Sequence, residues 1–369
     1  MAERLPGSFP IPLANFPPAQ PSDVPALHHS NSPLLRCFMK IAVVGCGAVG
    51  SFYGAKLARA GHEVHFLLRT DYEAVRRQGV LIHSPEGDFQ VQPQCARSPE
   101  EIGPADLVLI GLKTTANEAF AKLLPPLVGS GTAVLTLQNG LGNEEALARL
   151  FPAGQIMGGL CFVCLNRVAP GVIQHIGYGQ VVLGEFQRPA EPRTQAIADQ
   201  FCAAGVPCTV TDNLARAHWQ KLVWNIPFNG LGVAGAAGYE ALIAPHSVLP
   251  APLSTGPQAT NTLPTDKLLA DARWARLVRD LMLEVIAAAR ALGFDVPDAV
   301  ADRQIERTRT MGAYRASTLI DFERGQPLEL ESLFLEPLRQ ATRAGVAAPR
   351  LLALCAVLQD LDKRAHSAR

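Results

Sequence analysis

The sequence has no excess charge of either sign, because its 33 lysines and arginines balance 33 aspartates and glutamates. A neutral chain gives no electrostatic reason to expect a nucleic acid or an anionic membrane surface as a partner. No apolar run approaches the roughly 18 residues that a membrane-spanning helix needs. A basic start followed by an apolar segment is also missing, so we expect no secretory signal.

Cysteine clusters of the kind that hold a metal are missing as well. Among eight cysteines, only Cys161 and Cys164 have the CxxC spacing, and they lie in an apolar run typical of a buried strand. An odd spacing points two side chains to opposite faces of a strand, and no second cluster completes a zinc site. We therefore expect buried free thiols and no metal, in a reducing compartment, which favours a cytoplasmic protein.

Residues 1–38 differ from the rest of the chain. They contain eight prolines and no periodic apolar pattern, which predicts a disordered extension. Because Met39 directly precedes the first apolar run, a start site assigned too far upstream is the alternative. The remaining length suits two domains, which we place at 39–211 and 212–365. A proline-rich stretch at 244–265 predicts a surface insertion in the second domain.

The first domain alternates apolar strands with helices, which is the pattern of a parallel sheet covered on both faces. Glu86-Gly87 marks the turn of a hairpin over 80–92, and consecutive strands fill 155–185. The other predicted strands are 40–44, 63–68, 107–112, 133–137 and 207–211, and the predicted helices are 48–60, 71–78, 115–126 and 192–204.

Helical patterns dominate after about residue 212, where no segment has the character of a strand. The second domain should therefore be all-α. The predicted helices are 214–237, 267–292, 297–309, 328–344 and 349–362.

A glycine-rich turn follows the first strand. Gly45, Gly47 and Gly50 have the spacing GxGxxG, with Ala48 and Val49 before the last glycine. The first glycine allows a tight turn, the second lets the backbone approach a pyrophosphate, and the third lets helix and strand pack closely. Since a helix N-terminus offers free N–H groups to phosphate oxygens, we predict that a dinucleotide binds here. A glycine turn that serves packing only is the alternative.

The residues at the end of the second strand distinguish a site for NAD from a site for NADP. An NAD site usually has an acidic residue there, whereas this sequence has Leu67-Leu68-Arg69. Arginine suits the 2′-phosphate of NADP through paired N–H donors, and Lys113, just past another strand, is within reach of the same phosphate. Asp71 is the counter-candidate that would favour NAD, and a solvated loop arginine is the other alternative.

Three polar residues lie within a strongly apolar helix. Lys221, Asn225 and Asn229 are spaced by four, so they share one helical face. Burying an ammonium and two amides costs free energy unless they are paired, so the stripe indicates a polar cleft. An exposed helical face is the alternative, because lysine and asparagine are common there.

Two further sets of polar residues are candidates. Asn139 follows a strand directly and lies at the carboxyl edge of the sheet, where ligands bind in α/β folds, although Asn-Gly is also common turn chemistry. Ser317 and Asp321 precede Glu329 near the C-terminus. Considered alone, they indicate a helix cap and a solvated face.

Five motifs in this order resemble the ketopantoate reductases, between Met39 and about residue 362. The resemblance implies a Rossmann-like α/β domain joined to an all-α domain of the 6-phosphogluconate dehydrogenase C-terminal type, with the substrate in the cleft between them. It also implies NADPH-dependent reduction of 2-dehydropantoate (ketopantoate) to pantoate, in pantothenate and coenzyme A biosynthesis. The motifs are MKIAVVGCGAVGSFYGAKLARAGHEVHFLLR, LKTTANEAF, TLQNGLGNEE, WQKLVWNIPFN and STLIDFERGQPLELE.

The resemblance further implies a role for each candidate residue. Lys221 matches the catalytic lysine, which hydrogen-bonds the 2-oxo group, donates a proton to it and stabilises the developing oxyanion. Glu329 matches the glutamate that orients the substrate hydroxyl and this lysine. The implied substrate-binding residues are Asn139, Asn225, Asn229 and Ser317, and the implied NADP-binding residues are Gly45, Gly47, Ala48, Val49, Gly50, Arg69, Lys113 and Asn139.

The sequence departs from the family pattern in the domain that shapes the substrate pocket. Phe334-Leu335 stands where many members have Asn-Gly, and Leu328 precedes Glu329 where threonine is common. A reductase of a different 2-oxo acid is therefore one alternative. A nucleotide-sensing regulator is a second, although it would not need Lys221. In each case the partner is a small molecule, and a homodimer is as open as a monomer.

Overall fold

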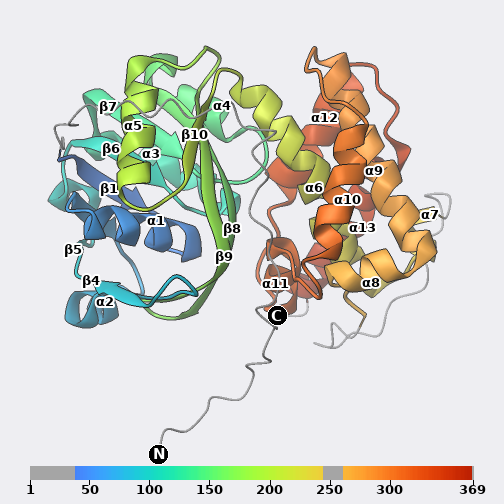
Figure 1. The fold of residues 1–369 in the computed structure, drawn as a ribbon, viewed down its shortest axis with the longest axis horizontal. Coiled ribbons are helices and arrows are strands. Elements are labelled where there is room, and N and C mark those ends of the chain that lie inside the picture. Colours follow the sequence, from blue (N-terminus) through green and yellow to red (C-terminus); the bar gives the residue numbers. More distant parts are fainter. Residues whose placement is uncertain (1–37, 244–260, 368–369) are drawn as a thin grey trace, which may run out of the picture.

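The computed structural model describes residues 38–243 and 261–367. They form an α/β part and a helical part that lie side by side (Figure 1). The predicted extension at 1–38, except for Phe38, and most of the predicted insertion at 244–265 lie outside the described residues. None of the helices in the described ranges has both the length and the apolar character that crossing a membrane requires.

One sheet of ten strands forms the centre of the α/β part, in the order β4-β3-β9-β8-β7-β6-β1-β2-β5, with β10 paired to β9. Its strands are β1 (Lys40–Val44), β2 (Glu63–Leu67), β3 (Val80–His83), β4 (Phe89–Val91), β5 (Gln94–Ala96), β6 (Ala105–Ile110), β7 (Val128–Thr136), β8 (Ile156–Ala169), β9 (Val172–Glu185) and β10 (Cys208–Thr211).

The sheet is parallel in its centre and mixed as a whole. Strands β7, β6, β1 and β2 run parallel to one another, as predicted, and the unpredicted strand β5 continues this parallel order. The predicted hairpin over 80–92 is confirmed by the antiparallel pair β3–β4. The segment predicted as consecutive strands, 155–185, forms two 14-residue strands that pair antiparallel.

Helices cover both faces of the sheet because its central strands are apolar on both sides. Ile41 and Val43 face one core with residues of α1 and α5, whereas Ala42 and Val44 face the other core with residues of α3 and α4. The helices of this part are α1 (Ala48–Arg59), α2 (Tyr72–Gln78), α3 (Phe120–Leu123), α4 (Asn143–Ala148) and α5 (Pro192–Ala203), with short turns η2 (Pro99–Glu101), η3 (Thr114–Ala119), η4 (Pro125–Leu127) and η5 (Ala153–Gln155).

The helical part is built around α6 (Leu214–Ala234), which packs against α9, α11 and α13 and also contacts β8 and β9. Gly230 allows this packing, because a Cβ there would lie 2.6 Å from Leu354 and 2.9 Å from Phe334. The other elements are η6 (Gly235–Ala237), α7 (Glu240–Ile243), α8 (Thr265–Ala270), α9 (Ala272–Ala291), α10 (Ala299–Arg309), α11 (Ser317–Glu323), the π-helix η7 (Glu331–Leu335), α12 (Glu336–Arg343) and α13 (Pro349–Ser367).

The helical prediction differs from the structure at four points, one of which is the unpredicted short helix α7. The helix expected over 267–292 is broken at Asp271, whose side chain accepts from the backbone N–H of Arg273 and begins α9 as an N-cap. The helix expected over 328–344 starts later, so Glu329 lies in the segment before it. The short helix α11 was not predicted, since its seven residues carry too few apolar positions to show a period.

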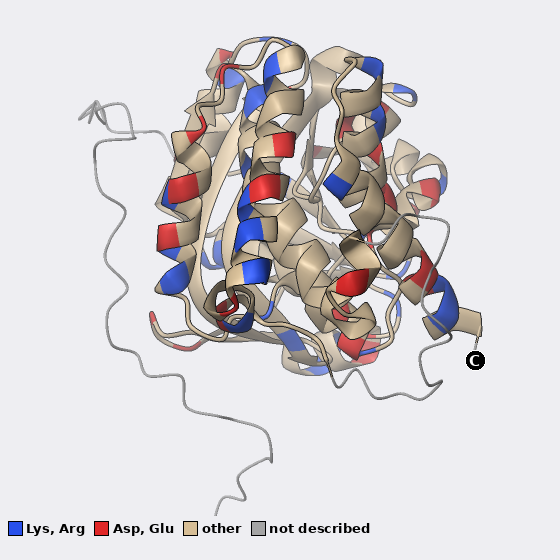
Figure 2. Cartoon of the chain, turned by 90° about the vertical axis from the view of Figure 1, so that its right-hand side faces the viewer, with Lys and Arg blue, Asp and Glu red and all other residues tan. Residues whose placement is uncertain are grey.

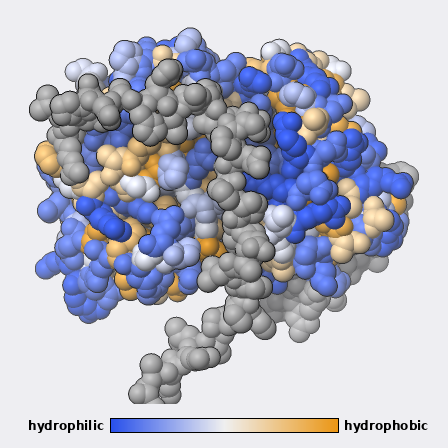
Figure 3. Space-filling view, in the orientation of Figure 1, coloured by the Kyte–Doolittle hydropathy of each residue, from blue (hydrophilic) through white to orange (hydrophobic). Residues whose placement is uncertain are grey.

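Charged residues of both signs alternate over the helices seen in Figure 2, and neighbours of opposite sign pair, as Arg279 does with Asp302 at 2.8 Å. Hydrophilic residues dominate the face seen in Figure 3. Most large apolar side chains of the described residues are buried, in the two cores on either face of the sheet and in a third core within the helical part.

Replacing Phe334, which is fully buried against α6, tests the core of the helical part. We expect Phe334→Ala to lower the free energy of unfolding by about 3–5 kcal/mol, because it removes a buried ring and leaves a cavity. Urea denaturation measures this. Leu352→Ala, at an exposed position of α13, is the control and should change stability by less than about 0.5 kcal/mol. Equal losses in the two variants would contradict the described packing.

Candidate active site

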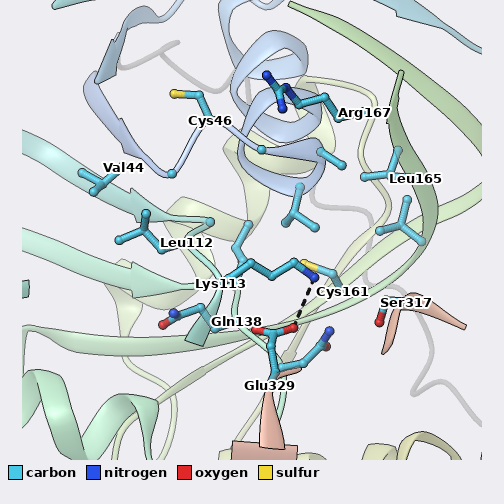
Figure 4. Close-up of a pocket in the computed structure, with 18 of the residues that line it drawn as sticks. Val44, Cys46, Leu112, Lys113, Gln138, Cys161, Leu165, Arg167, Ser317 and Glu329 are labelled. Carbon is cyan, nitrogen blue, oxygen red and sulfur yellow. Dashed lines mark hydrogen bonds and ion pairs between the residues drawn. The ribbon is translucent and has the colours of Figure 1, made fainter. Parts of the chain in front are cut away.

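A cavity of about 920 Å³ lies between the carboxyl ends of the central strands and the helical part. Figure 4 shows that residues from both parts point into it, including Lys113 and Glu329. Every predicted site residue lines this cavity except Gly50. The lining members of that set are Gly45, Gly47, Ala48, Val49, Arg69, Lys113, Asn139, Lys221, Asn225, Asn229, Ser317 and Glu329.

The glycine turn joins β1 to α1 with a different constraint at each glycine. Gly45 has a φ of +95°, which is the left-handed region that favours glycine. A Cβ on Gly50 would lie 2.2 Å from the carbonyl oxygen of Gly45, so the third glycine serves packing. A Cβ on Gly47 would meet no protein atom within 4 Å. Since protein packing does not require glycine at this position, the open space is where a ligand would approach the backbone.

The N-terminus of α1 faces the cavity without a side-chain cap. Gly47 is the N-cap residue and offers no side chain to the first helical N–H groups. Ala48 and Val49, the first two helical residues, line the cavity. Free N–H groups and the positive end of the helix dipole suit an anion such as a pyrophosphate.

The residues after β2 divide into a paired acid and an unpaired base. The carboxylate of Asp71 is buried and accepts from both ends of the Arg167 guanidinium, with Nε at 2.9 Å. It also accepts from the backbone N–H of Gly171 at 3.3 Å. Arg69, in contrast, is exposed at the cavity and forms no ion pair within the described residues. The counter-candidate acid is therefore engaged elsewhere, whereas the arginine is available.

Arg97 is a second base at this edge that sequence reasoning missed. Strand β5 is next to β2, and the N–H of Leu68 donates to the carbonyl of Ala96 at 2.9 Å, so Arg69 and Arg97 follow neighbouring strand ends. The guanidinium of Arg97 lies over the ring of Tyr72, 4.0 Å from its centroid. The strand β5 was not predicted, because three residues carry no readable pattern.

Lys113 connects the two parts of the molecule. Its ammonium lies 2.7 Å from Asp321 Oδ2. It also lies 3.4 Å from Glu329 Oε2 (Figure 4). Burial works to lower the pKa of Lys113, but the two carboxylates outweigh it and raise the pKa. Glu329 Oε1 also accepts from the backbone N–H of Thr114 at 2.7 Å.

Asp321 is thus the ion-pair partner of a cavity residue, although its sequence signal was no more than a polar helical position. Burial raises the pKa of its carboxyl group, and the neighbouring Lys113 offsets part of this rise. Only the tertiary structure brings this carboxylate to Lys113, which lies 208 positions earlier in the chain.

Lys221 lies on the cavity wall with its ammonium 2.7 Å from Asn139 Oδ1, across the junction of the two parts. Its ammonium also lies 5.5 Å from the centroid of the Phe162 ring. Burial lowers the pKa of Lys221, while Cys161 and Glu329 act in the opposite direction. A lysine with a lowered pKa, held by one acceptor, is suited to give up a proton.

The rest of the polar stripe is buried, which decides against an exposed helical face. Asn225 and Asn229 are 7% and 3% exposed, respectively. Asn229 Oδ1 accepts from Ser317 Oγ at 3.3 Å and from the backbone N–H of Thr318 at 3.0 Å. Lys221, Asn225, Asn229 and Ser317 therefore form one polar wall of the cavity.

The predicted buried free thiols at Cys161 and Cys164 are confirmed. Both line the cavity, as do the two residues between them. Burial raises the pKa of Cys161 to about 11. Phe334-Leu335 does not line the cavity, since Phe334 is fully buried in the helical core.

Two family models match this chain. One, described as Ketopantoate reductase PanE/ApbA, matches residues 41–188, and the one for its C-terminal part matches residues 255–362. The chain is also 40% identical over 331 residues to the 2-dehydropantoate 2-reductase of Nostoc sp., covering 88% of this chain and 96% of that protein. The chain belongs to the ketopantoate reductase family. It is therefore an oxidoreductase of a nicotinamide-dependent family.

Solved structures agree with this assignment. The crystal structure of 2-dehydropantoate 2-reductase from Geobacter metallireducens GS-15 has a TM-score of 0.77 and 46% identity, covering 87% of this chain and 99% of that chain. A ternary structure of D-mandelate dehydrogenase with NADH and anilino(oxo)acetate has a TM-score of 0.75 and 20% identity, covering 89% and 100%, and shows the fold alone. The predicted fold, a Rossmann-like α/β domain followed by a helical one, is confirmed.

Two glycine variants separate packing from ligand binding. Gly47→Ala should change stability by less than about 0.5 kcal/mol, because its Cβ meets no protein atom. It should nevertheless weaken dinucleotide binding about tenfold, since the new methyl group fills the approach path. Gly50→Ala should instead destabilise the fold by about 1–3 kcal/mol through its clash with Gly45. Thermal unfolding and fluorescence titration measure both effects, and unchanged binding in Gly47→Ala would count against the predicted site.

Proposed function

We propose that this chain reduces 2-dehydropantoate to pantoate with NADPH, as a step of pantothenate and coenzyme A biosynthesis. The observation that carries the proposal is that the Lys221 ammonium, held 2.7 Å from Asn139, lines the same cavity as the glycine turn. The names of the relatives support the choice of substrate.

Lys221 is the proton donor in this proposal. Bound NADPH would supply the hydride to the 2-oxo carbon. Lys221 hydrogen-bonds the 2-oxo oxygen, stabilises the negative charge that develops there and transfers its proton to that oxygen. Asn139 holds the ammonium in position through its Oδ1.

The polar wall holds the substrate in this proposal. Asn225 and Asn229 bind its polar groups, and Ser317, at the first position of α11, binds the carboxylate. Glu329 orients the substrate hydroxyl group. The Glu329 carboxylate is held for this by the Thr114 N–H and by Lys113.

A preference for NADP over NAD rests on Arg69. The acid that would accept from the ribose of NAD, Asp71, is engaged by Arg167. Arg69 is unpaired at the cavity, and Arg97 follows the neighbouring strand. Lys113, predicted for the same phosphate, lies instead against Asp321 and Glu329, so we assign the 2′-phosphate first to Arg69.

A different 2-oxo acid as substrate has lost its main support. The argument for it was the bulky Phe334-Leu335, and neither residue lines the cavity. Membership of an oxidoreductase family also leaves no reason to keep the alternative of a nucleotide-sensing regulator. We further propose a cytoplasmic location. Size-exclusion chromatography with light scattering decides between a monomer and a homodimer, which are equally open.

A steady-state assay tests the proposed function directly. NADPH and NADH are each offered with 2-dehydropantoate and with a panel of other 2-oxo acids. We expect the highest kcat/KM for NADPH with 2-dehydropantoate. Absence of any NADPH oxidation would overturn the function, and a better 2-oxo acid in the panel would overturn the substrate.

The pH dependence of kcat tests the role of Lys221. Reduction needs the ammonium form, and burial lowers its pKa, so kcat should fall as pH rises through a value below the ordinary 10.5. The reverse oxidation needs the neutral amine and should rise through the same value. Lys221→Ala should lower kcat about 10²–10⁴-fold. It should also abolish the fall of kcat at high pH, which we call the alkaline limb. Lys267→Ala, exposed on α8, is the control, and a limb that persists without Lys221 would contradict the assignment.

A charge variant tests the cofactor preference. Arg69→Ala should raise the KM for NADPH about tenfold or more and leave the KM for NADH within about twofold, because only NADPH has the 2′-phosphate. Arg77→Ala, exposed on α2 and outside the cavity, controls for a general loss of positive charge. An equal rise for both cofactors would show that Arg69 does not read the phosphate.

A further inference from the structure

Four side chains form a continuous chain of hydrogen bonds along and behind the cavity wall. Thr136 Oγ1 donates to Gln138 Oε1 at 2.9 Å, and Gln138 Nε2 donates to Asn117 Oδ1 at 2.8 Å. Asn117 Nδ2 donates to Asn143 Oδ1 at 2.9 Å. Asn143 Nδ2 then donates to the backbone carbonyl of Asn139 at 3.1 Å. The chain therefore ends on the residue that holds the proposed proton donor.

The orientation of every amide in this chain is determined. Gln138, Asn117 and Asn143 each accept at the oxygen and donate at the nitrogen, so turning one amide over breaks two bonds. Gln138 and Asn143 are 5% and 1% exposed. Because a buried amide without partners costs free energy, the chain behaves as one unit.

The loop over 139–143, where this series of hydrogen bonds ends, needs such support. Gly140 and Gly142 both have a φ of +88°, and glycines in the left-handed region leave the unbound loop many alternative conformations. On the side of the helical part, the N–H of Leu141 donates to the carbonyl of Ser332 at 2.9 Å. On the side of the sheet, Asn143 provides the hydrogen bond to Asn139.

Lys221 determines which way the Asn139 amide faces. An ammonium only donates, so Asn139 Oδ1 must point toward it, as the 2.7 Å distance shows. The Asn139 Nδ2 group is then left to donate into the cavity that the residue lines. A displaced loop would change both interactions together.

We propose that Asn117 and Asn143 are positioning residues for the reduction, which hold Asn139 so that its amide accepts from Lys221 and donates to the bound molecule. Neither residue lines the cavity, so both act through Asn139. The inference rests on the proposed function, because that function makes Lys221 the proton donor.

The position of Asn117 links this series of hydrogen bonds to Glu329, the carboxylate of the site. Asn117 lies in η3, the turn whose first residue, Thr114, donates its N–H to Glu329. One short turn thus orients Glu329 directly and Asn139 through the amide chain. Asn117, which is half-buried and does not line the cavity, thus contacts both polar arrangements from behind the wall.

Three variants test the inference. Asn117→Asp keeps the acceptor for Gln138 but replaces the donor to Asn143 with a second acceptor, at almost unchanged volume. Asn143→Ala removes the bond to the carbonyl of Asn139. Gln155→Ala is the matched control, because this amide also donates to two backbone carbonyls, those of Gly129 and Thr132, but lies outside the cavity.

We expect Asn117→Asp and Asn143→Ala each to lower kcat about tenfold, the effect of one hydrogen bond to a charged partner. The KM for NADPH should stay within about twofold, and the double variant should lose little more than either single one, since both act on one chain. The alkaline limb of kcat should move to lower pH, because a displaced Asn139 no longer stabilises the ammonium. Gln155→Ala should match the wild type in kcat and in this limb.

A second measurement reads Lys221 without substrate. The pH dependence of Lys221 acetylation by acetic anhydride, followed by peptide mass spectrometry, should show a lower apparent pKa in both variants. The inference would be overturned if both variants kept the wild-type kcat, the wild-type pH of the alkaline limb and the wild-type apparent pKa from acetylation. It would also be overturned if Gln155→Ala lost as much kcat as the two variants. If the wild-type chain reduces no 2-oxo acid, the proposed function fails, and the labelling still decides whether the amide chain positions Lys221.

Discussion

The hydrogen bond between the Lys221 ammonium and the Asn139 amide joins the helical part of this molecule to the α/β part at the cavity. It brings the middle of the most buried helix, α6, to the loop that follows β7. An ammonium placed in this cavity is costly unless it has an acceptor, and burial already lowers the pKa of this lysine. The fold therefore has to deliver an oxygen to one defined place, and the amide chain behind the loop serves that requirement.

The same junction is closed by further polar contacts rather than by apolar packing alone. Glu329 accepts from Thr114, Ser332 Oγ donates to the Thr114 hydroxyl, and His218 lies 2.9 Å from Glu144 in a buried pair. Each contact is directional, so the two parts are held in one register with the cavity between them. A polar junction suits an oxidoreductase of this family, because the cleft must accept two polar ligands and exclude bulk water from a proton and hydride transfer.

Prediction from sequence succeeded where a local pattern has one physical meaning. The spacing of Gly45, Gly47 and Gly50 after an apolar strand fits only a tight strand-to-helix turn, and each glycine has the expected surroundings. Prediction was less complete where partners are distant. Lys113 was assigned to a phosphate from its place after a strand, yet its ammonium meets Asp321 and Glu329, more than 200 positions away. The alternative that the polar stripe lies on an exposed helical face was also based on local pattern. The burial of Asn225 and Asn229 excludes it.

The sequence by itself determined the central parallel strands, the glycine turn, the all-α second half and many of the residues that line the cavity, because apolar periodicity and glycine spacing act over a few residues. Only the tertiary structure decided that Asp71 is engaged by Arg167, that Phe334 belongs to a core, and that Asn117 and Asn143 stand behind Asn139. These facts depend on which strand ends and helices meet. That pairing results from packing the whole chain at once, which no short segment encodes.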